Sequence, residues 1–83
     1  MKIKNNIAVS DNGFVFNPGS GESYTANQVG LDMLNMLRKG EKSAAIISFI
    51  AEKYEADPAV IEKDLNDFSE TLKQYHLSQH EEL

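Results

Sequence analysis

The sequence has no cysteine, so neither a disulfide bond nor a thiolate metal site can brace the fold. It also has no long apolar run. The longest apolar window, Ala44 to Ala51, is interrupted by Ser48 and is far shorter than the ~20 residues that a membrane-spanning helix needs. The first residues, Met1 to Asn6, lack the apolar stretch of a secretion signal. We therefore expect a cytoplasmic protein.

Basic residues are scarce and unevenly distributed. The chain has eight Lys and Arg residues against thirteen Asp and Glu residues, which gives a net charge of −5. Residues 1–40 have a charge balance of +1, whereas residues 41–83 have four lysines and ten carboxylates, a balance of −6. Phosphate backbones and anionic lipids repel such an acidic half. We therefore expect neither nucleic acid nor a membrane as a partner.

The length of 83 residues allows a single domain with one modest core. No repeat and no long linker divides the chain, and we expect the domain to span residues 1–77. The tail from Ser78 to Leu83 has no packing pattern and is expected to be flexible.

The first part of the chain has the pattern of short strands joined by turns. Asn6 to Ser10 is a β-type run, and Asp11-Asn12-Gly13 suits a tight hairpin turn that leads into Phe14 to Phe16. The breaker-rich segment Asn17 to Gly21 then precedes a third short run, Glu22 to Ala26. Three strands joined by two turns indicate an antiparallel meander.

After residue 27 the spacing of apolar residues changes to that of a helix. Its start is open, because Thr25 and Gln28 have capping-box spacing while Asn27 is an equally good cap. Gly40, which follows the basic pair Arg38-Lys39, predicts its end.

Two further helices are predicted. One runs from about Ser43 to Tyr54. The other begins at the cap Asp57 with Pro58 in the first helical position. Its apolar residues recur at alternating spacings of four and three: Ile61, Leu65, Phe68, Leu72 and Tyr75. Together the elements predict an α+β, winged helix-turn-helix-like fold, with a three-stranded antiparallel sheet followed by three helices.

The residues that could carry chemistry do not form a convincing catalytic site. His76 and His80 lie four residues apart, but no third ligand is positioned to complete a zinc geometry, so solvated residues at a helix end explain them better. Asp64 and Asp67 could serve acid–base catalysis only inside a pocket, and so small a core leaves little room for one. We expect no catalytic residue, no metal and no other cofactor.

A winged helix usually binds DNA through its third helix, and here that helix has the wrong charge. It carries four carboxylates and two lysines: Glu62, Asp64, Asp67 and Glu70, with Lys63 and Lys73. Phosphate contacts require the opposite balance. The sequence therefore predicts a winged-helix fold whose third helix does not bind DNA.

The stretch from Val15 to Gly30 resembles the N-terminal signature of the PqqD family, which is a strand, a turn with Gly, an aromatic residue, a spaced Asn and a Gly three residues later. Gly40 matches the Gly that closes the family's first helix. Further matches lie in the last two helices: Tyr54, Asp57, Asp64, Leu65 and Phe68. The likeness covers Ile7 to Leu77, and its specificity comes from order and spacing.

PqqD-like domains are winged-helix modules that bind the leader segment of ribosomally made, post-translationally modified peptides. They present the precursor to a modifying enzyme, often a radical enzyme. In the family the leader adds as an extra strand beside the third strand and packs against the third helix. The resemblance thus implies a non-catalytic peptide chaperone with these peptide-binding residues: Glu22, Ser23, Tyr24, Thr25, Ala26, Asp64, Asp67, Phe68 and Thr71.

Four positions depart from the family pattern. Leu34 replaces a common Trp, Ala26 a common Leu, His76 a common Gly, and Ser69 a common apolar residue. Ala26 and Ser69 imply a shallower or more polar groove. Two alternatives to the leader-peptide chaperone remain open: a winged-helix DNA-binding regulator, and a structural interaction module in a larger complex.

Overall fold

Three short strands and three helices follow one another in the computed structural model, which describes residues 2–78. The elements are β1 (Ala8–Val9), β2 (Phe14–Asn17), β3 (Glu22–Thr25), α1 (Gln28–Arg38), α2 (Ser43–Lys53) and α3 (Pro58–Gln74). This order confirms the predicted fold class.

The three strands form one antiparallel sheet in the order β1-β2-β3. Val15 pairs with Val9 on one side and with Tyr24 on the other, so β2 lies in the centre and β3 forms an edge. The turn before β2 depends on Gly13, whose φ of +90° is in the left-handed region. A Cβ at this position would collide with the main-chain oxygen of Ala26, so the turn requires glycine.

Side-chain caps set the starts of α1 and α3. Asn27 accepts a hydrogen bond from the Gly30 amide at 2.8 Å, which resolves the open start of the first helix in favour of Asn27. Asp57 caps α3 through the Ala59 amide, as predicted from the sequence. All three helices end with a left-handed residue just past the C-cap: Gly40, Glu55 and His76.

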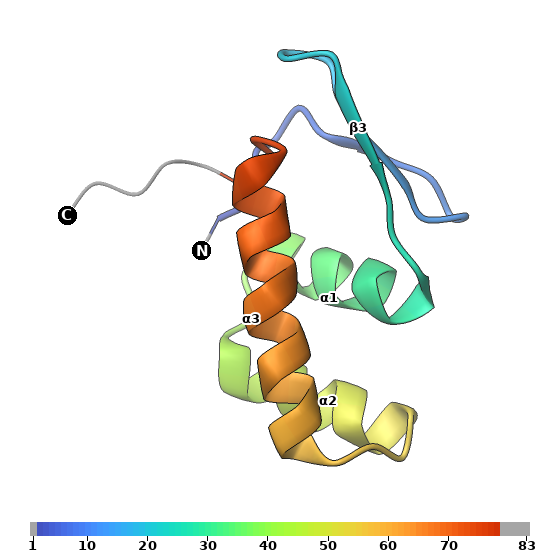
Figure 1. The fold of residues 1–83 in the computed structure, drawn as a ribbon, viewed down its shortest axis with the longest axis vertical. Coiled ribbons are helices and arrows are strands. Elements are labelled where there is room, and N and C mark those ends of the chain that lie inside the picture. Colours follow the sequence, from blue (N-terminus) through green and yellow to red (C-terminus); the bar gives the residue numbers. More distant parts are fainter. Residues whose placement is uncertain (1, 79–83) are drawn as a thin grey trace, which may run out of the picture.

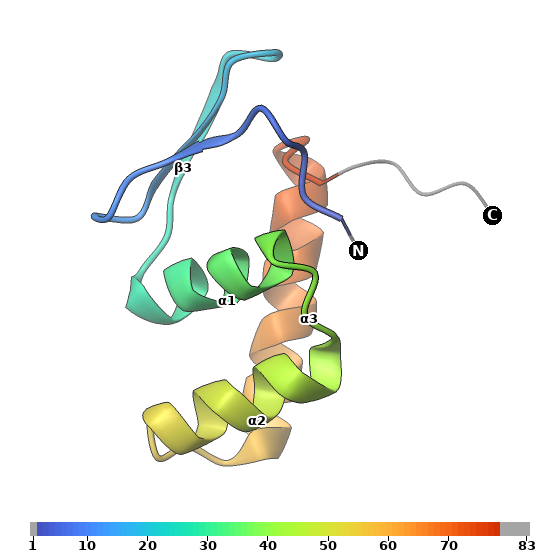
Figure 2. The ribbon, with the colours of Figure 1, turned by 180° about the vertical axis from the view of Figure 1, so that it is seen from behind.

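The core is formed between the sheet and the three helices. Its completely buried side chains come from every layer: Val15, Leu34, Ile46, Ile50, Leu72 and Leu77. Figures 1 and 2 show α1 between the sheet and α2, with α3 passing alongside all three. As a result β3 and the C-terminal half of α3 are neighbours although they are far apart in the sequence.

The last described residues return to the beginning of the chain. Ser78 forms a single antiparallel bridge with Ile3, and the Lys4 amide donates a hydrogen bond to the Leu77 carbonyl at 3.0 Å. Ser78, predicted to begin the tail, is therefore paired, while residues 79–83 of that tail lie outside the described part. No helix within residues 2–78 is long and apolar enough to span a membrane.

Candidate functional site

A groove of about 660 Å³ runs between β3 and α3. On the sheet and α1 side it is lined by Tyr24, Thr25, Asn27, Val29, Gly30 and Met33. On the other side it is lined by Tyr54 and Ala56 at the end of α2, and by six residues of α3: Val60, Ile61, Asp64, Asp67, Phe68 and Thr71. The groove therefore combines an apolar floor with polar groups on its α3 wall.

The edge of β3 offers main-chain groups next to this groove. The Ala26 amide donates to the Gly13 carbonyl at 2.8 Å, so the main chain of Ala26 faces β2. Main-chain groups alternate in direction along a strand, which places those of Tyr24 toward β2 and those of Ser23 and Thr25 outward. By this alternation the Ser23 and Thr25 amides point away from β2, the only strand paired with β3 in the sheet of residues 2–78. The open edge thus has two unpaired residues.

Side-chain directions on β3 follow the same alternation. Ser23 and Thr25 are exposed, whereas Tyr24 is half-buried and packs on Phe68 of α3 and on Tyr75 just past the end of that helix. Its ring centroid lies 6.3 Å from that of Phe68 and 5.3 Å from that of Tyr75. The Tyr24 side chain therefore points toward α3.

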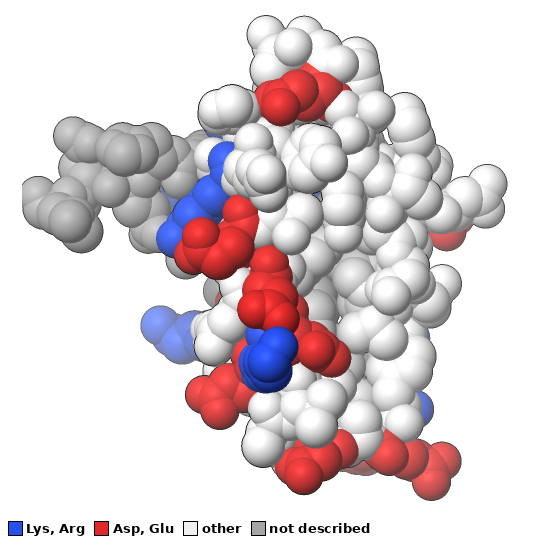
Figure 3. Space-filling model, viewed as in Figure 1, with Lys and Arg blue, Asp and Glu red and all other residues white. Residues whose placement is uncertain are grey.

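The α3 wall of the groove is acidic. Asp64 and Asp67 both line it, and Asp67 has an ion pair with Lys63, one turn earlier on the helix, at 3.0 Å. Figure 3 shows acidic side chains gathered along α3, with basic ones among them, beside a nearly uncharged surface toward β3. A cationic side chain that extends from the groove to α3 would meet carboxylates there.

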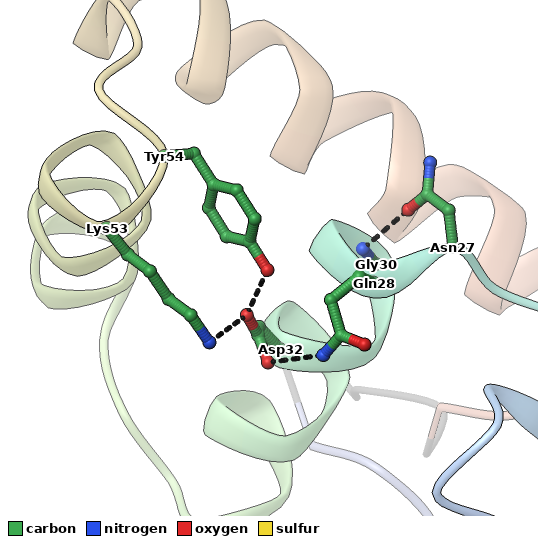
Figure 4. Close-up of polar contacts among 6 residues, drawn as sticks. All are labelled: Asn27, Gln28, Gly30, Asp32, Lys53 and Tyr54. Atoms are coloured by element: carbon green, nitrogen blue, oxygen red, sulfur yellow. Dashed lines mark hydrogen bonds and ion pairs between the residues drawn. The ribbon is translucent and has the colours of Figure 1, made fainter.

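A polar cluster fixes the end of the groove next to α2 (Figure 4). The Tyr54 hydroxyl donates a hydrogen bond of 2.5 Å to Asp32 Oδ2, and Lys53 Nζ contacts the same oxygen at 2.8 Å. Burial of the Asp32 carboxyl opposes its ionisation, but the hydrogen bonds from Lys53 and Tyr54 outweigh burial and lower the pKa of Asp32 below 3.8. The Asp32 carboxyl is therefore ionised at neutral pH.

The opposite end carries a second contact between the sheet and α3. Glu22 Oε1 lies 2.7 Å from His76 Nδ1, at the start of β3 and just past the end of α3. This hydrogen bond is the main reason why the pKa of Glu22 falls below 4.5, against a smaller opposing effect of desolvation. Both side chains are solvent-accessible, so this hydrogen bond links β3 and the end of α3 at the protein surface.

The structure brings six of the nine sequence-predicted site residues together in the groove: Tyr24, Thr25, Asp64, Asp67, Phe68 and Thr71. The other three do not line it. Ser23 offers its main chain at the edge, Glu22 pairs with His76, and Ala26 is buried, with 5% of its surface exposed and its amide already bonded. Ala26 can contribute to the groove only as packing beneath it.

Sequence reasoning missed eight lining residues. Val60 continues the stripe of Asp64 and Phe68 by one turn, so a longer reading of the same spacing would have found it. Asn27, Gly30 and Tyr54 carry the family resemblance but were not assigned to the site. Ile61 belongs to the apolar stripe of α3 that the sequence predicted, but it was not assigned to the site. The other three come from α1 and from the segment between α2 and α3, and only tertiary packing brings them to the groove: Val29, Met33 and Ala56.

The expectation that Ser69 makes the groove more polar is wrong. Ser69 lines a separate depression on the opposite side of α3, with Leu65 and the segment from Leu37 to Ser43. His80 of the histidine pair lies outside the described residues. Within residues 2–78 no three His, Cys, Asp or Glu side chains are grouped closely enough to hold a metal ion.

A three-stranded sheet followed by three helices, with a groove between the edge strand and the last helix, defines a winged-helix module. The chain belongs to the PqqD family: residues 13–77 match the family described as coenzyme PQQ synthesis protein D. Comparison with curated protein sequences gives no significant match.

Two solved structures have the same fold. One is described as TbiB1 in complex with the TbiA(beta) leader peptide; it has a TM-score of 0.85 and 24% sequence identity, and the match covers 100% of both chains. The other is described as lasso peptide synthetase B1 complexed with the leader peptide, with a TM-score of 0.83, 22% identity and coverage of 95% of this chain and 96% of that one. At these identities the likeness establishes the fold.

Proposed function

We propose that this chain is a non-catalytic peptide chaperone that binds the leader segment of a ribosomally made precursor and presents the precursor to a peptide-modifying enzyme. The observation that carries this proposal is the unpaired edge of β3 beside a groove of about 660 Å³. Membership of the PqqD family and two structural neighbours described as leader-peptide complexes support it.

In the proposed complex the leader adds as a fourth strand to the sheet. The outward amides and carbonyls of Ser23 and Thr25 provide the main-chain hydrogen bonds, because those of Tyr24 already pair within the sheet. Strand addition uses main-chain groups for affinity and side-chain pockets for specificity. The binding segment Glu22 to Ala26 is thus narrowed to two residues that bond the leader.

The side chains of the leader strand alternate, and every second one enters the groove. Those side chains meet the apolar surface of Phe68, Met33 and Val60, so apolar leader residues fit there. Asp64 and Asp67 on the α3 wall favour Lys or Arg at neighbouring leader positions. Thr71 completes the proposed wall at the end of the groove nearer β3.

The charges of α3 argue against the alternative of a DNA-binding regulator. In a winged helix the third helix would enter the major groove and would face phosphates. Here its exposed surface includes Glu62, Asp64, Asp67 and Glu70. Lys63 and Lys73 each lie in an ion pair with one of these acids, so neither is available to phosphate without breaking a pair.

An NMR titration tests the proposal. The ¹⁵N-labelled protein would be titrated with synthetic leader segments of short open reading frames that neighbour its gene. Saturable shift changes along β3 and the facing side of α3 are expected for one of them, and a scrambled peptide of the same composition serves as control. Equal responses to both peptides, or changes confined to β1 and α2, would contradict the proposal.

A further inference from the structure

Tyr54 forms the wall of the groove where α2 ends, and one residue outside the groove holds it there. Asp32 of α1 does not line the groove, yet its Oδ2 accepts the hydrogen bond from the Tyr54 hydroxyl at 2.5 Å. Figure 4 shows the Tyr54 side chain crossing from the end of α2 toward α1 to reach Asp32. The position of this wall therefore depends on a contact between two helices.

Asp32 is itself fixed by more than one donor. Lys53 Nζ lies 2.8 Å from Oδ2, and Gln28 Nε2 donates to Oδ1 at 3.3 Å. The side chain of Asp32 is only 14% exposed. With both oxygens engaged and little solvent around it, the carboxylate offers Tyr54 one defined acceptor position.

The backbone alone does not fix the Tyr54 ring. Tyr54 is the C-cap of α2, and the next residue, Glu55, turns into the left-handed region with a φ of +51°. A side chain at a helix end has more than one staggered rotamer open to it. Within the described residues the bond to Asp32 is the one side-chain hydrogen bond of the Tyr54 hydroxyl.

The protonation states keep the bond intact across the physiological range. The hydrogen bond to Asp32, with burial as the second cause, raises the pKa of Tyr54 above 10.0, so the hydroxyl keeps its proton. The pKa of Asp32 is lowered below 3.8, so the acceptor stays charged. Donor and acceptor thus persist together at any pH at which the protein would meet a peptide.

We infer that Asp32 is a positioning residue for peptide recognition: it holds the Tyr54 ring as the end wall of the groove and thereby sets the affinity for the leader side chain that contacts this wall. This inference rests on the proposed leader-binding function. Asp32 acts through Tyr54 and need not touch the peptide.

Removal of either partner of the bond should have the same effect. Asp32→Ala and Tyr54→Phe are each expected to weaken leader binding about tenfold, because the ring loses its defined orientation. The double variant should bind no more weakly than either single variant, since both remove one interaction. Tyr54→Phe changes no charge, so an equal loss also excludes a purely electrostatic role of Asp32.

Glu70→Ala is the matched control. Like Asp32→Ala it removes a carboxylate and its ion pair with a lysine, but Glu70 contacts neither Tyr54 nor the groove. Because this pair is exposed, Glu70→Ala should change stability little and leave leader affinity within about twofold of the wild-type value. As a second readout, each residue of the leader is replaced by alanine in turn. One of these substitutions should weaken binding to the wild-type protein but not to Asp32→Ala, because its contact with the Tyr54 ring is already lost.

Isothermal titration calorimetry well below the unfolding temperature, with the leader segment that responds in the NMR titration, distinguishes the outcomes. Equal losses for Asp32→Ala and Tyr54→Phe, non-additivity and a nearly unaffected Glu70→Ala support the inference. Wild-type affinity in Asp32→Ala, or an equal loss in Glu70→Ala, overturns it while leaving leader binding intact. If the wild-type protein binds none of the leader segments, the inference and the proposed function are overturned together.

Discussion

The side-chain amide of Asn17 donates a hydrogen bond of 2.8 Å to the main-chain carbonyl of His76, which lies 59 residues further along the chain. Asn17 is 2% exposed, and its Oδ1 accepts a second hydrogen bond from the Gly19 amide at 2.9 Å. One buried side chain thus joins the turn between β2 and β3 to the end of α3. This link, with the nearby pair of Glu22 and His76, sets the distance between the two groove walls.

Loss of the Asn17 side chain should therefore destabilise the fold. Asn17→Ala leaves the His76 carbonyl and the Gly19 amide without these partners in a partly buried site, and we expect a loss of about 1–3 kcal/mol in the free energy of unfolding. Urea denaturation measures it. The exposed turn residue Asn12 is the control, because Asn12→Ala removes no buried hydrogen bond and should change stability by less than ~0.5 kcal/mol. Equal effects of the two variants would contradict this role of Asn17.

The ends of the helices predict a stabilising substitution. Past α2 the Ala56 amide donates to the Ala51 carbonyl at 2.9 Å around the left-handed Glu55, a conformation that glycine adopts without strain. Glu55→Gly should raise the free energy of unfolding by up to about 1 kcal/mol, or about 5 °C in melting temperature. Gly40 occupies the same position after α1 with a φ of +84°, so Gly40→Ala should lower stability by about as much. A destabilised Glu55→Gly variant would count against this explanation.

Asp32 predicts a specific dependence of stability on pH. Because its pKa in the folded state is below the ordinary value of 3.8, the unfolded chain binds more protons near that pH than the folded one. The contribution of Asp32 is therefore present above about pH 4 and is lost as the pH falls through its folded-state pKa. Melting temperatures from pH 2.5 to 6 should rise less steeply in Asp32→Ala than in the wild-type protein. Identical slopes would show that the carboxylate is not held in the folded state as described.

The acidic wall predicts how leader charge affects affinity. Reversal of both groove carboxylates, Asp64→Lys with Asp67→Lys, should weaken a leader that carries Lys or Arg by about tenfold at low salt and less at high salt. Glu62→Lys with Glu70→Lys is the matched control: it changes the net charge equally and also breaks one ion pair, but outside the groove. Folding should survive in both, since exposed charges contribute little to stability. An equal loss in the control would indicate a general charge effect instead of a groove contact.

The sequence was sufficient for the elements whose signals are local. Asp57 and Pro58 predicted the start of α3 correctly because a cap and a proline act within one turn. The predicted first strand, Asn6 to Ser10, was too long, since only Ala8–Val9 forms a strand. Ser10 instead closes the turn: its side chain accepts a hydrogen bond from the Phe14 amide, a use that strand propensity does not reveal.

The groove was only half predictable for the same reason. Phe68 and Thr71 follow from the helical spacing of α3 and the family resemblance, whereas Met33 and Ala56 reach the groove only through the packing of α1 and α2. Ser69 shows why neighbours in the sequence need not line the same groove. It is adjacent to Phe68 in sequence, but the helix turns by about 100° per residue and directs it to the opposite depression.

Amide hydrogen exchange at β3 tests the central claim most directly. In the free protein the Ser23 and Thr25 amides face outward and should exchange quickly, while the Tyr24 amide is already paired with β2 and should exchange slowly. Saturation with the leader should slow exchange at Ser23 and Thr25 and leave Tyr24 nearly unchanged, because an added strand bonds only the outward groups. Unchanged exchange at Ser23 and Thr25 in the saturated complex would contradict strand addition at this edge.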